Sequence, residues 1–185
     1  MNKIRFGTKE IIAVIVVIAL YVISEWGERY LIGCGLISIA VLDWVKIRVL
    51  IVVVSSAIFG PIVGIICGVG GALLVDMMYY SNVRYGEIIA YAMNGYIIGR
   101  YRDIFGVLKG EFRGIKLLDF NIIQLLCMIV GAVLFLPLFF FITENANMRE
   151  SIVIGTKSAV GCFVLTGTVG TCILYIISKI RGNRH

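Results

Sequence analysis

Long, uninterrupted apolar runs are the feature that most constrains this chain. Ile11–Ile23 and Leu125–Ile142 contain no charged residue. A membrane β-strand alternates apolar and polar residues, whereas a helix that crosses a hydrocarbon core needs roughly 20 apolar residues in a row. The chain is 60% hydrophobic and 15% charged, against about 45–50% and about 25% in soluble domains. These properties predict an all-α integral membrane protein and exclude a soluble enzyme and a disordered chain.

The apolar runs divide the chain into six predicted transmembrane helices within a single domain, residues 1–185. Residues 25–46 form a long first outer loop, in which Leu31–Leu42 is apolar but too short to cross a bilayer. Gly60-Pro61 marks a tight turn, because proline is tolerated in the first turn of a helix. Residues 102–119 are interpreted as a charged linker. The six predicted helices are 8–24, 47–59, 61–80, 85–101, 122–142 and 152–180.

The distribution of lysine and arginine orients these helices. With the N-terminus inside, 11 of the 17 basic residues fall in inner loops or inner helix ends, as expected for cytoplasmic segments. Both termini are therefore predicted to be cytoplasmic, in a multi-pass membrane protein. The first run lacks a small-residue cleavage site, which predicts a retained helix and not a cleaved signal peptide.

The sequence lacks the residues that several kinds of chemistry require. No Gly-x-x-x-x-Gly-Lys-Ser/Thr loop is present, so the chain is not expected to hydrolyse ATP. The only histidine is His185, which argues against histidine-based metal sites and catalytic triads. The five cysteines are expected to be buried free thiols, since most lie in apolar runs. We expect no catalysis, no cofactor, no metal and no nucleic-acid partner.

Polar residues in the predicted outer half form the candidate binding site. Glu87, Tyr91 and Asn94 are spaced i, i+4 and i+7, so they share one helix face. Ionisable residues within membrane helices usually face the bundle interior or a cavity. With aromatic residues nearby, such a pocket suits a flat polar heterocycle. The full candidate set is Trp26, Trp44, Tyr79, Glu87, Tyr91, Asn94, Asn145 and Lys157.

Each of these residues also has a structural explanation. Glu87 and Lys157 are a possible ion pair, or reach the membrane interface separately. The tryptophans and tyrosines are also typical of an interfacial aromatic belt, and the asparagines of turns. Gly60, Gly64 and Gly68, at i, i+4 and i+8, indicate close helix packing. That packing is either internal or against a membrane partner.

The segment Phe59–Asp76, with its Gly-Pro-x-x-Gly-x-x-x-Gly pattern, resembles the substrate-binding S components of energy-coupling factor (ECF) transporters, of the riboflavin-type branch. The resemblance implies a multi-pass protein of a prokaryotic cell membrane that captures a vitamin or precursor from outside. A separate membrane-embedded energy-coupling subunit and two ATPase subunits would then drive uptake. It also implies partner docking, for which the residues here are Ala13, Ala19 and the glycines Gly60, Gly64 and Gly68.

The chain departs from the family pattern at two places. Val17 stands where a second small docking residue is expected, and Gly161-Cys162-Phe163 stands where a polar amide is common. The chain begins Met1-Asn2-Lys3 and lacks the Met-x-His start of cobalt and nickel components. Riboflavin is the first expected ligand, and a pyridine or pyrimidine vitamin or precursor is the second. The rival interpretations are a ligand-free membrane scaffold or assembly protein and a small intramembrane enzyme.

Overall fold

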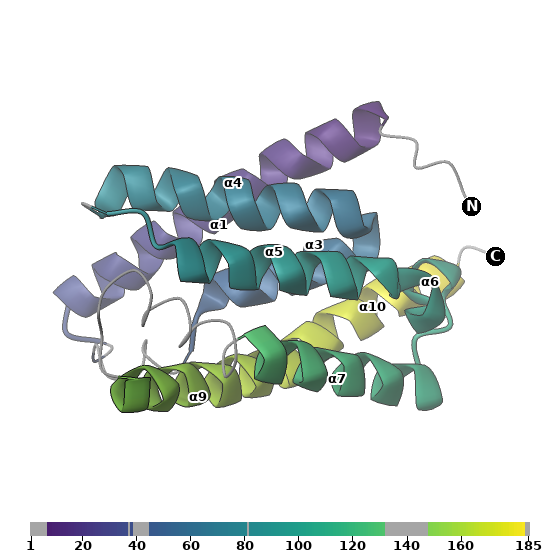
Figure 1. Ribbon diagram of the computed structural model, residues 1–185. Helices are drawn as coiled ribbons and strands as arrows, with labels where there is room; N and C mark the ends of the chain where they lie inside the picture. Colours follow the sequence, from purple (N-terminus) through teal and green to yellow (C-terminus); the bar gives the residue numbers. More distant parts are fainter. Residues whose placement is uncertain (1–6, 37, 39–44, 81, 132–147, 184–185) are drawn as a thin grey trace.

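The computed structural model describes residues 7–36, 38, 45–80, 82–131 and 148–183, and most of these residues lie in helices (Figure 1). Successive long helices run antiparallel, so that α1 begins and α10 ends at the same end of the bundle. We call the other end, where α3 and α5 begin, the pocket end. The elements are α1 (Thr8–Gly33), α3 (Ile47–Phe59), α4 (Pro61–Tyr79), α5 (Tyr85–Arg100), α6 (Arg102–Phe105), η1 (Val107–Lys109), α7 (Ile115–Met128), α9 (Met148–Leu165), η3 (Thr166–Gly170) and α10 (Thr171–Gly182).

Helices α4 and α5 approach each other through glycine. A Cβ atom at Gly64 would lie 2.5 Å from the carbonyl oxygen of Gly95, and one at Gly95 would lie 2.4 Å from that of Gly64. Neither position therefore has room for a side chain. Gly60, which links α3 to α4, has φ +97°, a conformation that L side chains rarely adopt. These glycines set the spacing of the helices that carry the candidate site.

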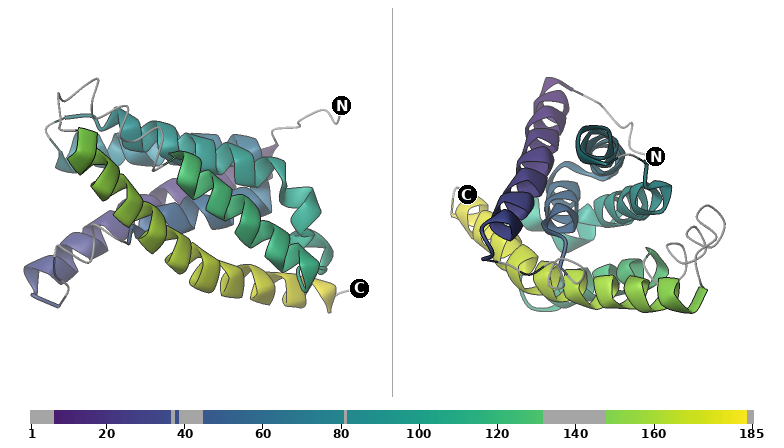
Figure 2. Two further views of the ribbon diagram at one scale, coloured as in Figure 1. Left: turned by 60° about the horizontal axis from the view of Figure 1, so that its bottom comes forward. Right: turned by 90° about the vertical axis from the view of Figure 1, so that its left-hand side faces the viewer.

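Helix α1 crosses the outside of this core and packs mainly against α3 and α4 (Figure 2). Tyr21 is fully buried, with its ring against Gly71 of α4. The opposite face is exposed and apolar, and includes Ile12, Ile15 and Ile23. An apolar face of this kind is expected where a helix meets lipid.

The last long helix is continuous but changes its winding in the middle. Residues of η3 form a π-helical segment between α9 and α10, and the whole helix curves along the bundle (Figure 2). Such segments insert an extra residue into the hydrogen-bond ladder and bend helices. The bend lets α9 contact α7 and α3, while α10 contacts η1 at the other end.

Among the described residues, three helical stretches are long and apolar enough to cross a membrane: Thr8–Gly33, Pro61–Tyr79 and Gly155–Gly182. Ile47–Phe59 is apolar but shorter. The chain is thus an all-helical protein with membrane-spanning character, and the count of six spans and their orientation stay predictions. The second half of the predicted helix 122–142 lies outside the described residues.

Two of the expected boundaries were wrong. Helix α1 does not end near Ser24 but continues to Gly33, because the acidic residues of its last turns have buried partners on other helices. Helix α7 begins at Ile115, inside the segment interpreted as a charged linker. Its first turns bury Phe120 against Phe105 and Phe112, so tertiary packing extends the helix into this segment.

Candidate functional site

A cluster of charged side chains lies at the pocket end, where α1 and α4 end and α3 and α5 begin. It contains equal numbers of acidic and basic residues, contributed by these four helices and their connections. Burying a charge is costly unless it is paired, and most of these groups have a partner of opposite charge. The members are Glu25, Glu28, Arg29, Lys46, Arg48, Asp76, Arg84 and Glu87.

Glu87, in the first turn of α5, is the centre of this cluster. Its carboxylate lies 2.6 Å from Lys46 Nζ and 3.1 Å from Arg84 Nη1, and Tyr91 donates its hydroxyl hydrogen at 3.1 Å. The residue is only 7% exposed. A buried carboxylate with three donors is a fixed negative charge, and its orientation is determined by the residues directly before α3 and α5 and by Tyr91 of α5.

Two further carboxylates attach α1 and α4 to the same cluster. Asp76 accepts hydrogen bonds from the backbone N–H and the guanidinium of Arg84. Glu25 accepts from Arg29 and from the hydroxyl of Tyr80, and lies 3.2 Å from Arg48. These contacts explain the continuation of α1 beyond its apolar part.

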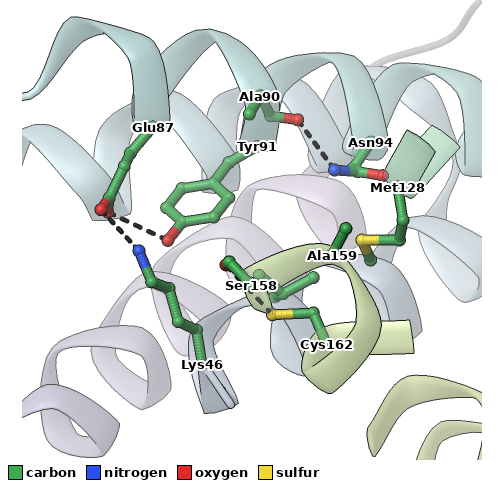
Figure 3. A pocket seen from close by; sticks show the side chains of 10 residues that line it. Lys46, Glu87, Ala90, Tyr91, Asn94, Met128, Ser158, Ala159 and Cys162 are labelled. Carbon is green, nitrogen blue, oxygen red and sulfur yellow. Dashed lines mark hydrogen bonds and ion pairs between the residues drawn. The ribbon is translucent and has the colours of Figure 1, made fainter. Parts of the chain in front are cut away.

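A small pocket lies directly beside this cluster, between α3, α5, α7 and α9 (Figure 3). Its volume is about 30 Å³, which is room for about two water molecules. The wall is mostly apolar, with polar groups at its two ends. The lining residues are Lys46, Val49, Glu87, Ala90, Tyr91, Asn94, Met128, Ser158, Ala159 and Cys162.

Asn94 contributes a polar group to this pocket that is not satisfied by the described residues. Its Nδ2 donates to the carbonyl oxygen of Ala90 at 3.0 Å. Its Oδ1 is buried and has no hydrogen-bond partner among the described residues. The side chain is 4% exposed and extends beside Met128 (Figure 3).

Of the six predicted ligand-binding residues that the structure describes, three lie together at the pocket and three do not line it. Glu87, Tyr91 and Asn94 line the pocket. Lys157 is exposed on α9, and Trp26 is 59% exposed and stacked on Tyr30.

The other predicted residues are distributed differently. Tyr79 is partly buried, with the guanidinium of Arg29 4.8 Å from its ring centre. Trp44 and Asn145 lie outside the described residues.

The residues predicted for partner docking are mostly inside the bundle. Gly60, Gly64 and Gly68 are buried, and a Cβ atom on any of them would lie within 3.0 Å of a neighbouring atom. Ala13 is also buried, whereas Ala19 is exposed. The glycine row therefore serves internal packing, the first of the two alternatives that its spacing allowed.

Sequence reasoning missed the half of the pocket that does not belong to α5. Lys46 was assigned only to the predicted first outer loop, yet it contacts Glu87, 41 positions away. Ser158 and Cys162, at i and i+4 on α9, face the pocket directly after the exposed Lys157. Their spacing was the available signal, since it places both on one face.

The expectation about the cysteines holds for three of the five. Cys67, Cys127 and Cys162 are buried thiols that form no disulfide, whereas Cys34 and Cys172 are exposed. Among the described residues, no group of three histidine, cysteine, aspartate or glutamate side chains has a metal-binding arrangement.

Known proteins from bacteria are similar to the chain over much of its length. A protein of Lacticaseibacillus casei is 29% identical over 126 residues, 68% of each chain. One of Streptococcus pneumoniae (strain Hungary19A-6) is 30% identical over 127 residues, 67% of this chain and 64% of the relative. These relatives are UPF0397 proteins. The UPF0397 protein of Streptococcus gordonii is 23% identical over 187 residues, 98% of this chain and 95% of its own. No protein-family model matches the chain, and no solved structure does.

Proposed function

We propose that this protein is the substrate-binding S component of an ECF-type importer. In this proposal it binds a small water-soluble vitamin or precursor in the pocket between α3, α5, α7 and α9. The observation that carries the proposal is the convergence of Glu87, Tyr91 and Asn94 on one mostly apolar pocket. The resemblance of Phe59–Asp76 to S components supports it. The membrane-spanning character of the helices agrees with it.

The pocket chemistry favours binding without reaction. Its apolar wall, with the ring of Tyr91, suits the faces of a flat heterocycle, while Lys46 and Asn94 provide polar groups at the two ends. Glu87 is held by three donors, which leaves it poorly placed to accept a proton from a substrate. Riboflavin is the first ligand to test, followed by pyridine and pyrimidine vitamins and their precursors.

Ligand binding requires the pocket to widen. A volume of about 30 Å³ is far below the roughly 300–1,000 Å³ of pockets that enclose drug-sized ligands. The walls that can yield are the flexible side chains of Lys46 and Met128 and the helix α9. We propose that α9 moves away from α5 when the ligand enters.

Transport would need further subunits. The chain has no phosphate-binding loop, so the proposal assigns energy supply to two ATPase subunits and a membrane-embedded coupling subunit. The exposed apolar face of α1 is available to such a subunit or to lipid. Purified chain alone in vesicles should therefore not accumulate vitamin against a gradient.

Thermal unfolding of the purified protein in detergent tests the proposal. Each water-soluble vitamin, and its common precursors, would be added at increasing concentration. A ligand that binds only the folded state at 100 times its Kd stabilises it by about 2.7 kcal/mol, which raises Tm measurably. Glu87→Gln should reduce the shift. A panel that leaves Tm unchanged throughout would contradict the proposal.

A membrane scaffold without ligand is the second candidate. It is favoured by the water-sized pocket and by the pairing of the buried charges around it. A scaffold predicts an unchanged Tm with every vitamin and stable co-purification with another membrane protein. An S component predicts a ligand-dependent Tm, so the same experiment separates the two.

A further inference from the structure

The orientation of the Asn94 side chain is fixed by chemistry. The carbonyl oxygen of Ala90 can only accept a hydrogen bond, so the atom 3.0 Å from it is the amide nitrogen. The oxygen Oδ1 must then point the other way, toward the side of the pocket formed by Met128 (Figure 3). The pocket thus presents an acceptor and not a donor at this end.

Asn94 Oδ1 is an acceptor at the pocket that still needs a hydrogen-bond donor. Asn94 is 4% exposed and its Oδ1 has no hydrogen-bond partner among the described residues. Leaving a buried acceptor unmet costs free energy that a donor on a ligand would recover. By contrast, the carboxylate of Glu87 already forms ion pairs with Lys46 and Arg84 and accepts a hydrogen bond from Tyr91. A cationic ligand would therefore find no open carboxylate there.

The other end of the pocket offers a donor. The ammonium group of Lys46 has three hydrogens, and its contact with Glu87 Oε1 uses one of them. Asn94 lies seven positions after Glu87 in α5, which corresponds to about 10 Å along the helix. This length matches a fused-ring heterocycle. Val49, Ala90 and Ala159 line the pocket, and their side chains suit uncharged ring faces.

We propose that the ligand is an uncharged flat heterocycle with an N–H donor, as in a lactam, an imide or a carboxamide. The N–H donates to Asn94 Oδ1, and a carbonyl oxygen of the same molecule accepts from Lys46. This inference rests on the proposed function and narrows it to one class of ligand. It makes Asn94 the residue that distinguishes N–H compounds from their N-methylated analogues.

Calorimetric titration of the full chain in detergent tests the inference with matched pairs. The pairs are riboflavin and 3-methylriboflavin, nicotinamide and N,N-dimethylnicotinamide, and uracil and 1,3-dimethyluracil. Methylation removes the donor and leaves Oδ1 unmet, so the N–H member of the bound pair should have about 5- to 150-fold higher affinity. Asn94→Ala should weaken that member by a similar factor and remove the difference between the two.

Asn121→Ala is the matched control, because Asn121 on α7 donates to its own i−4 carbonyl in the same way and does not line the pocket. It should keep the full preference for N–H. Equal affinity within the bound pair overturns the inference, as does a preference that survives Asn94→Ala. The comparison in the unmodified protein stays decisive if Asn94→Ala does not fold.

The outcomes also separate this inference from the proposed function. If another vitamin raises Tm while no N–H member of the pairs binds, the ligand class is wrong and the S-component assignment stands. If no vitamin or precursor raises Tm, both the ligand class and the S-component assignment are contradicted. Binding of an N–H member with discrimination that depends on Asn94 supports both.

Discussion

Lys46 Nζ lies 2.6 Å from Glu87 Oε1 and thereby joins the residue before α3 to the first turn of α5. The two residues are 41 positions apart in the chain. Both also line the pocket. The contact therefore couples the relative position of two helices to the state of the binding site.

Removing the acid of this pair should cost more stability than removing the base. Glu87→Leu leaves Lys46 unpaired and takes a partner from Arg84 and Tyr91, so we expect a loss of about 3–5 kcal/mol. Lys46→Met leaves Glu87 with two donors and should cost about 1–3 kcal/mol. Equilibrium unfolding in detergent measures both.

The exposed pair of Lys116 and Glu111 is the control for these variants. Lys116→Met should change stability by less than about 1 kcal/mol, because exposed ion pairs contribute little. Equal losses for Lys46→Met and Lys116→Met would mean that burial does not strengthen the pocket pair.

The close approach of α4 and α5 predicts that replacing glycine by alanine destabilises the protein at some positions and stabilises it at others. Gly64→Ala or Gly95→Ala would place a Cβ atom about 2.5 Å from backbone atoms, so each should destabilise by about 1–3 kcal/mol or more. Gly27→Ala, in α1 with no atom within 4 Å of its Cβ position, should stabilise by about 0.5–1 kcal/mol. Comparable tolerance at all three positions would contradict the packing described for α4 and α5.

The sequence predicted the helices that local signals delimit. Ile47–Phe59 matches α3, because Gly60-Pro61 both ends one helix and starts the next. The end of α1 and the start of α7 depend instead on tertiary contacts. Glu25 and Glu28 are typical of a loop in the sequence. In the structure they are buried because Glu25 pairs with Arg48 and Glu28 accepts a hydrogen bond from the backbone N–H of Ile47.

The candidate site was predictable where one helix supplies the residues. The i, i+4, i+7 spacing predicted that Glu87, Tyr91 and Asn94 share a face, and they line one pocket. Helical spacing does not determine which other helices face them. Lys157 was chosen for its charge, but Ser158, the next residue, is about 100° further round the helix and faces the pocket.

Filling the pocket should abolish binding without unfolding the protein. Ala159 is buried at the pocket wall, and Ala159→Leu would occupy the space a ligand needs. We expect loss of the ligand-induced rise in Tm, with a stability change of about 1–3 kcal/mol. Val160→Leu, at an exposed neighbouring position, should leave ligand binding unchanged. A ligand response that survives Ala159→Leu would place the binding site elsewhere.

Cys162 reports whether the pocket opens. It is buried in the pocket wall, and its sulfur lies 3.9 Å from Ser158 Oγ. In a variant that keeps only this cysteine, a small water-soluble maleimide should react slowly, since reaction waits for α9 to separate from α5. A bound ligand should slow the reaction further by occupying the opened space. A variant that keeps only the exposed Cys172 should react at a rate that ligand does not change. Fast reaction of Cys162 that ligand leaves unaltered would mean that the thiol is reached by another route, and that opening of the pocket is not the step that admits the ligand.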